Sequence, residues 1–220
     1  MMKANNMSPM SLVLSYPRSG MNWLRHCVET MSGRLTPGPH LGLLDTDQYA
    51  FCRLHNIKRG QAKANPRGAS WNRVCLILRD YCENYVCTPY FQRSKFTTIK
   101  KWNFTSYAEN ILYFNQYPGP KLLLRYESHV KGFDDSIQFL EWAEIPHQPL
   151  AASQLQAEVQ RSKGQYRKDQ NKYYRRIPNR QITPETAAAA RQSLVKILGE
   201  SMFAKYLGCY DRPLPASKAA

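Results

Sequence analysis

The chain has 220 residues, and its mass of 25.5 kDa suits a single domain. Hydrophobic residues make up 43% of it and aromatic residues 12%, which is enough to bury a core and excludes a wholly disordered chain. The 31 Lys and Arg outnumber the 16 Asp and Glu and give a net charge of +15. A charge of this sign and size predicts an anionic partner, such as a phosphate-bearing cofactor, an acidic glycan, nucleic acid or a membrane surface.

Targeting signals and metal-ligand spacings are missing from the sequence. It has no run of about 18 apolar residues, so no membrane span is predicted, and residues 1–10 lack the apolar stretch of a secretory signal peptide. The 6 cysteines form no CxxC pair and no zinc-ligand spacing. We therefore expect reduced thiols, no metal site and a cytoplasmic location.

The first third of the chain begins with a short apolar run at 11–16, which predicts a strand. Apolar residues then recur at helical spacing from Gly20 until Gly33, a typical helix stop. Residues 34–48 have the composition of a loop, 49–54 that of a second strand, and 56–72 that of a basic surface loop.

The middle of the chain repeats the alternation. Residues 73–78 form the clearest strand pattern and lead into a helix from about Tyr81. A helix over 107–117, a strand over 121–126 and a helix over 133–143 follow. Strands that alternate with helices predict an α/β fold, with a central, mostly parallel sheet flanked by helices in three layers.

The last part of the chain differs in composition. Residues 161–181 are rich in Lys, Arg and Tyr without apolar periodicity, and we expect a basic lid or a solvated loop there. Pro184 then opens a helix that continues through Leu198. No linker divides the chain, so 11–210 is expected to be one domain, with flexible ends at 1–10 and 211–220.

The most informative segment joins the first strand to the first helix and runs Tyr-Pro-Arg-Ser-Gly-Met-Asn-Trp over 16–23. A tight turn at a helix N-terminus directs unpaired N–H groups outward, and the helix dipole adds positive charge. Gly20 allows an anion to approach the backbone, and Arg18 supplies a full charge. The Walker A pattern is absent, which weakens the alternative of a nucleotide kinase. An ordinary strand–turn–helix corner remains the simpler alternative.

Residues 14–24 resemble the 5′-phosphosulfate loop of the sulfotransferases that use 3′-phosphoadenylyl sulfate (PAPS), whose pattern is close to YP[KR]SGTTWL. The resemblance implies a P-loop-like fold, and it implies that PAPS is bound by Arg18, Ser19, Gly20, Met21, Asn22 and Trp23. Trp23 would stack on the adenine, although it also belongs to the apolar face of the helix. Met21 and Asn22 replace the usual threonines, and only Asn22 keeps a side-chain donor.

Three later segments resemble further family motifs in the family's order. Arg79, at the end of the third strand, matches the family's 3′-phosphate arginine, although an ion pair with Asp80 is the simpler alternative. Tyr81 stands where the family has proline, and Cys87 stands at the position of a phosphate-binding serine.

The other two segments lie toward the C-terminal end. Tyr126, in a Tyr-Glu pair after the fourth strand, matches a tyrosine near the adenine. Arg175 and Arg176 resemble the entrance of the family's basic lid, with Ile177 where glycine is expected, and Arg161 with Lys163 offers another register.

Sulfuryl transfer needs a general base at the acceptor and positive charge on the transferring group. His55, in Cys-Arg-Leu-His at 52–55, resembles the base of the family's K-[TS]-H motif, and the same match places Arg53 on the transferring group and Arg18 on the bridging oxygen. Other candidates for the base are His40, Glu29 and Glu83. No metal is required.

The resemblance implies an enzyme that transfers a sulfuryl group from PAPS to a hydroxyl or amine and releases adenosine 3′,5′-bisphosphate (PAP). We expect the acceptor to be a small molecule or an anionic glycan, and we expect no stable nucleic-acid complex. Two alternatives remain: a basic nucleic-acid-binding protein, favoured by the charge and the Tyr–Arg interleaving at 161–181, and an inactive relative, favoured by Tyr81, Cys87 and Ile177.

Overall fold

The structure is a computed structural model, and it describes residues 11–36, 49–58, 71–87, 104–167 and 183–211. The predicted terminal extensions are 1–10 and 211–220, and all of their residues except Asp211 lie outside the described residues, so the domain limits remain predictions. None of the described helices combines the length and the apolar character needed to cross a bilayer.

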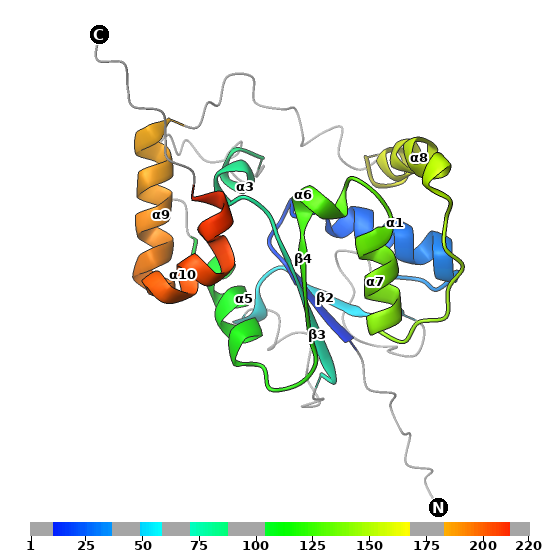
Figure 1. Cartoon of the computed structure of the whole chain (residues 1–220), viewed down its shortest axis with the longest axis horizontal. Coiled ribbons are helices and arrows are strands. Elements are labelled where there is room, and N and C mark those ends of the chain that lie inside the picture. Colours follow the sequence, from blue (N-terminus) through cyan, green and yellow to red (C-terminus); the bar gives the residue numbers. More distant parts are fainter. Residues whose placement is uncertain (1–10, 37–48, 59–70, 88–103, 168–182, 212–220) are drawn as a thin grey trace, which may run out of the picture.

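A four-stranded parallel sheet forms the middle layer (Figure 1). Its strand order is β2 (Cys52–Leu54), β1 (Ser11–Ser15), β3 (Arg73–Leu78) and β4 (Lys121–Arg125). The predicted α/β class with a mostly parallel sheet is therefore confirmed. β2 is shorter than the 49–54 predicted, because Tyr49 makes an isolated parallel bridge to Leu35 instead of pairing with β1.

Helices cover both faces of the sheet (Figure 1). One face carries α1 (Met21–Ser32), α7 (Asp134–Trp142) and α8 (Leu155–Arg167), and the other carries α5 (Thr105–Gln116), α9 (Pro184–Leu198) and α10 (Glu200–Leu207). Two short helices, α3 (Tyr81–Cys87) and α6 (Tyr126–His129), follow directly after β3 and β4. Single 3₁₀ turns at Ala152–Gln154 and Gly208–Tyr210 precede α8 and follow α10.

The strands divide the core into two apolar layers because successive side chains point to opposite faces. Leu12, Leu14 and Leu76 pack with the α5, α9 and α10 side, whereas Val13 and Ile77 pack with α1 and α7. All five are at most 1% exposed. Strands buried on both faces explain why the sequence shows continuous apolar runs rather than alternation.

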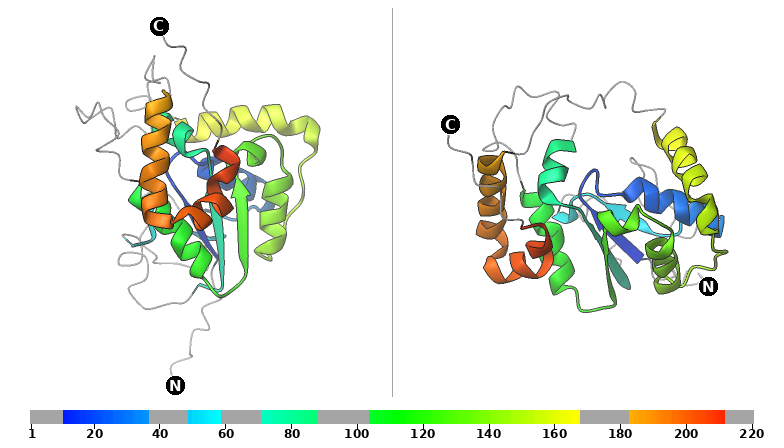
Figure 2. Two further views of the ribbon diagram at one scale, coloured as in Figure 1. Left: turned by 60° about the vertical axis from the view of Figure 1, so that its left-hand side comes forward. Right: turned by 45° about the horizontal axis from the view of Figure 1, so that its top comes forward.

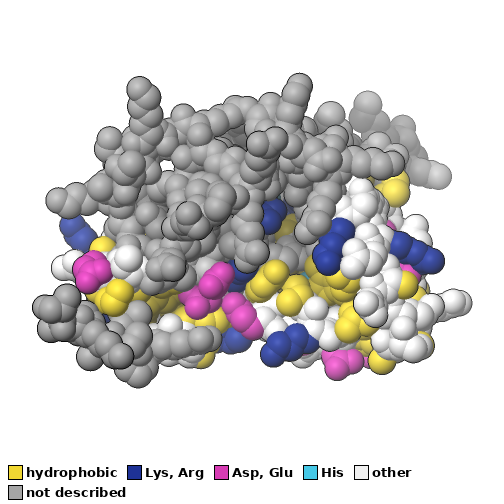
Figure 3. All heavy atoms as spheres, turned by 90° about the horizontal axis from the view of Figure 1, so that it is seen from above, with side chains coloured by type: hydrophobic (Ala, Val, Ile, Leu, Met, Phe, Trp, Pro, Cys, Tyr) yellow, Lys and Arg dark blue, Asp and Glu magenta, His cyan; other side chains and the backbone are white. Residues whose placement is uncertain are grey.

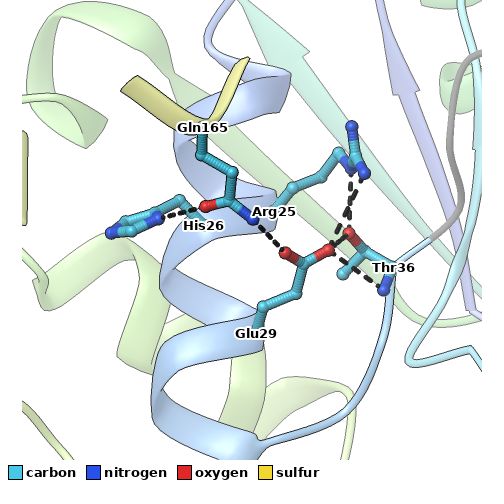
Figure 4. Close-up of polar contacts among 5 residues, drawn as sticks. All are labelled: Arg25, His26, Glu29, Thr36 and Gln165. Carbon is cyan, nitrogen blue, oxygen red and sulfur yellow. Dashed lines mark hydrogen bonds and ion pairs between the residues drawn. The ribbon is translucent and has the colours of Figure 1, made fainter. Parts of the chain in front are cut away.

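Helix α8 packs on α1 through polar side chains, as Figure 4 shows for the end of α8. His26 Nε2 lies 2.9 Å from Oε2 of Glu158, and its Nδ1 lies 3.0 Å from Oε1 of Gln165. The Gln165 amide in turn donates to Glu29 at 3.1 Å. Both ring nitrogens of His26 therefore contact side chains of α8.

The same network fixes the segment after α1. Arg25 Nε donates to Thr36 Oγ1 at 2.8 Å, and the Thr36 backbone N–H donates to Glu29 Oε1 at 3.2 Å (Figure 4). Arg25 is 9% exposed and lies 3.7 Å from the Glu29 carboxylate. Glu29 is therefore used to hold α1, Thr36 and α8 together.

Residues 161–167, expected to begin a basic lid or loop, are instead the end of α8. Both views in Figure 2 place α8 beside α1, on the other side of the sheet from α9. Glu158 is 2% exposed and accepts a hydrogen bond from Arg161 at 2.6 Å. The apolar side chains of α8 that pack against the core, Leu155 and Val159, precede residue 161, so apolar periodicity over 161–181 does not reveal the helix. The rest of the predicted lid, 168–181, lies outside the described residues.

Candidate functional site: the crevice at the carboxyl ends of β1 and β3

The strand order creates a topological switch point at the edge of the sheet formed by the carboxyl ends of β1 and β3, and we use the word crevice for this place. The chain leaves β1 for β2 on one side and later returns to β3 on the other side of β1. In open parallel α/β sheets, ligands bind outside the carboxyl ends of the strands at such a switch point. Here the loop that follows β1 carries Arg18, and Arg79 follows β3.

The loop after β1 is a tight turn that opens α1. The Ser19 N–H donates to the Tyr16 carbonyl at 3.2 Å, and Arg18 and Gly20 both have positive φ, 73° and 93°. The N–H groups of Trp23 and Leu24 bind the Gly20 carbonyl at 2.9 and 3.1 Å. The N–H groups that precede them have no partner within the helix, and they point out of its positive end. The turn therefore has the form of an anion-binding loop.

Gly20 is required by both its conformation and its surroundings. A Cβ atom at Gly20 would lie 2.9 Å from Cδ2 of Tyr126 and 3.3 Å from Cδ2 of His129. The loop consequently packs directly against α6.

We expect Gly20→Ala to lower the free energy of unfolding by about 2–4 kcal/mol, because positive φ and overpacking act together. Urea unfolding of three variants separates the two causes. Gly33 has a φ of +67° and nothing within 4 Å of an added Cβ atom, so Gly33→Ala should lower the free energy of unfolding by about 1 kcal/mol through backbone strain alone. Gly132→Ala meets nothing within 4 Å and should change little. A Gly20→Ala cost no larger than that of Gly33→Ala would show that the contact with α6 is unimportant.

Arg79 joins the loop to β3 and α6. Its Nη1 donates to the Arg18 carbonyl at 2.9 Å, and its guanidinium lies 4.2 Å from the centre of the Tyr126 ring. Nη2 lies 3.5 Å from Glu83, while the buried Nε has no hydrogen-bond partner among the described residues. Arg18, Gly20, Arg79 and Tyr126, all predicted from the sequence, thus meet in one place.

The alternative ion pair between Arg79 and Asp80 is not what the structure contains. Asp80 Oδ1 instead accepts the Cys82 N–H at 2.8 Å and so caps α3. Glu83, a reserve candidate for the base, is the residue that pairs with Arg79. Figure 3, viewed onto this edge of the sheet, shows side chains of both charges intermingled on its described part.

Ser19 is fully buried, and its hydroxyl accepts a hydrogen bond from the Asn84 amide of α3 at 3.0 Å. Met21 is 4% exposed and packs in the core, so it can offer an anion only its backbone N–H. Asn22 is half-buried on the first turn of α1. Asn84 was not predicted, because its bond to the loop depends on how α3 packs.

Trp23 does not occupy the predicted position of an adenine platform. Its ring stacks on His26 and Phe133, with centroids 5.8 and 5.9 Å apart, and its Nε1 donates to the His129 carbonyl at 2.8 Å. The side chain is 7% exposed. Because Trp23 lies on the apolar face of α1, which packs against the sheet, we assign its ring to the core rather than to an adenine-binding surface.

His55 follows β2 at the same edge of the sheet. Its Nδ1 donates to the Ser15 carbonyl, at the end of β1, over 2.9 Å. This bond places the proton on Nδ1 and leaves the lone pair on Nε2, the atom that a general base would use. The residue as a whole is exposed to solvent, but the protein packed around its ring lowers the pKa of His55 below 6.5 by desolvation. The Ser15 carbonyl opposes this effect and the Arg53 charge adds to it.

Arg53 pairs in register with Val13 of β1, one strand position before Leu54. It is half-buried, and its charge acts on His55. The reserve candidate Glu29 lies in the last turns of α1 within the network of Figure 4, away from the loop.

Several predicted residues cannot be placed. His40, Arg175, Arg176 and Ile177 lie outside the described residues, and so does the Cys87 side chain at the end of α3. In the other lid register, Arg161 pairs with Glu158 rather than pointing at the loop.

His129 is a buried group that the sequence did not single out. It is 0% exposed, and neither ring nitrogen has a hydrogen-bond partner among the described residues. Burial lowers the pKa of His129 to about 4, so the ring is neutral at pH 7. No local motif marks this position; its burial follows from the packing of α6 against Gly20.

No protein-family model and no curated protein matches the sequence. Among solved structures, the chain is similar to the crystal structure of mouse sulfotransferase SULT7A1 complexed with PAP. The two share 15% identical residues, the alignment covers 93% of this chain and 88% of the mouse chain, and the TM-score is 0.49. At this level of identity, function has to be argued from the residues of this chain.

Proposed function

We propose that the chain is a PAPS-dependent sulfotransferase that transfers a sulfuryl group to a hydroxyl or amine acceptor. The observation that carries the proposal is the meeting of the β1 loop with Arg79 at the switch point, where Arg79 Nη1 lies 2.9 Å from the Arg18 carbonyl. A cofactor with anionic groups at two separated positions needs two such cationic elements side by side.

PAPS carries a 5′-phosphosulfate and a 3′-phosphate. The N–H groups at the start of α1 and Arg18 suit the phosphosulfate, with Ser19, Gly20, Met21 and Asn22 supplying the loop backbone. Arg79 suits the 3′-phosphate, because its Nε is buried without a partner among the described residues. Tyr126, whose ring lies against the Arg79 guanidinium, is the proposed neighbour of the adenine. Arg175, Arg176 and Cys87 remain predicted contacts.

His55 is the proposed general base. As the acceptor oxygen or nitrogen forms its bond to sulfur, its proton moves to His55 Nε2, and the bond from sulfur to the 5′-phosphate oxygen breaks to release PAP. Arg53 and Arg18 stabilise the charge on the transferring group and on the departing phosphate. The proposed acceptors are small molecules or anionic glycans.

Isothermal titration of PAP in EDTA tests the cofactor directly. We expect micromolar or tighter binding without metal and much weaker binding of ATP. A screen with PAPS over phenols, amines and glycans then identifies the acceptor. The absence of PAP binding, together with oligonucleotide affinity that falls steeply with salt, would overturn the proposal in favour of nucleic-acid binding.

A further inference from the structure

Two buried polar side chains of α5, Tyr107 and Asn110, bind the backbone of the proposed phosphate-binding residue and of the proposed general base. Each is 1% exposed, and the two lie three residues apart, so they share one face of the helix. Their partners are the carbonyl groups of Arg79 and His55.

Asn110 holds the turn that carries His55. Its Nδ2 donates to the His55 carbonyl at 3.1 Å, and its Oδ1 accepts the Ile57 N–H at 3.0 Å. One amide thus fixes the backbone on both sides of Asn56. The ring of His55, already bound to the Ser15 carbonyl, is then restrained at its main chain and at Nδ1.

Tyr107 holds the end of β3. Its hydroxyl donates to the Arg79 carbonyl at 2.6 Å, and its ring lies 5.5 Å from that of Tyr16 in the loop after β1. Burial raises the pKa of Tyr107 far above 10, so the phenol stays a neutral donor. Tyr107 therefore contacts both strand ends that form the crevice.

We propose that α5 sets the separation between base and phosphate site, with Asn110 and Tyr107 as positioning residues for His55 and Arg79. This inference rests on the proposed function. A helix is stiff, so two side chains on one of its faces fix the relative places of the two groups that they hold. Transfer to an acceptor depends on such placement, because small displacements of reacting groups cost large factors in rate.

The test separates the two residues by what each variant changes. Asn110→Leu should lower kcat by about tenfold or more with PAP affinity unchanged, because only the base is released. Tyr107→Phe should weaken PAP binding by about fivefold, because the Arg79 carbonyl loses its donor. Turnover is measured with PAPS and the best acceptor of the screen, and affinity by titration of PAP.

Matched controls lie at other positions of the same region. The Tyr117 hydroxyl donates to the Trp71 carbonyl at 2.6 Å, before β3 rather than after it, so Tyr117→Phe removes an equivalent bond at the opposite edge of the sheet. Asn115, also in α5, accepts from Tyr206 at 2.9 Å, so Asn115→Leu serves as the amide control. Both should leave kcat and PAP affinity unchanged.

Hydrogen exchange distinguishes failure of this inference from failure of the proposed function. Asn110→Leu should accelerate exchange of the Ile57 amide, whose acceptor it removes, and Asn115→Leu should not. If PAP does not bind the parent chain, the proposed function fails and the inference fails with it. If the parent binds PAP and turns over, but Asn110→Leu and Tyr107→Phe behave like their controls, only the inference is overturned.

Discussion

Replacing His55 by Gln should reduce turnover by about 10²- to 10⁴-fold, the usual contribution of a general base, while PAP binding stays nearly the same. The reason is positional: the base contacts the acceptor, whereas the cofactor is held by the loop after β1 and by Arg79. Turnover with PAPS and titration of PAP on the same variant measure the two effects separately.

His147 offers a matched control for that variant. Its Nδ1 also bonds a backbone carbonyl, that of Ile145, at 2.9 Å. It lies in the segment after α7, outside the crevice. His147→Gln should keep full turnover. Unchanged turnover in His55→Gln would remove His55 from the mechanism and return the role to another candidate.

The pH dependence of the parent chain gives a second test of the same residue. A base must be neutral to accept a proton, and the pKa of His55 lies below 6.5 because the protein around the ring removes water. Activity should therefore be present above that pKa and fall as the pH decreases through it, so the acid limb of kcat/KM lies below pH 6.5. His55→Gln should lose this limb.

Most of the elements that the sequence predicted are stabilised by apolar burial. The strands β1, β3 and β4 are continuous apolar runs because both faces of the sheet are covered, and α1 has an apolar face that ends at Gly33. The helices α6, α8 and α10 were missed. α8 packs through the contact of Glu158 with His26 as well as through Leu155 and Val159. α6 and α10 are short, with four and eight residues.

The candidate site likewise contains residues that the sequence predicts and residues that it does not. Arg18, Gly20, Arg79 and His55 lie in local motifs at strand ends, and parallel strands bring their carboxyl ends to one edge. The residues that hold them in place, such as Asn110, act by bonds from side chain to backbone across 55 positions of sequence, which no local pattern encodes. Trp23 fitted two interpretations, and packing decided between them.

Arg79→Ala should weaken PAP binding by about 2–4 kcal/mol, because a charge-assisted contact to phosphate is lost from a partly buried site. The PAP affinity of Arg79→Lys should lie between those of Arg79→Ala and the parent. Lysine keeps the positive charge but lacks the planar guanidinium that stacks on Tyr126. Titration calorimetry gives the three affinities, and thermal unfolding shows whether the loop that Arg79 supports through the Arg18 carbonyl has survived.

Two comparisons decide what a loss in Arg79→Ala means. Arg73 starts the same strand at the opposite edge and pairs with Glu144, so Arg73→Ala removes an equal charge far from the crevice and should leave PAP affinity unchanged. Adenosine 5′-phosphate lacks the 3′-phosphate, so Arg79→Ala should bind it as well as the parent does. Equal losses for both nucleotides would mean that Arg79 supports the loop after β1 instead of binding the 3′-phosphate. If Arg79→Ala instead binds PAP as tightly as the parent, Arg79 does not contact the 3′-phosphate, and that phosphate must bind elsewhere.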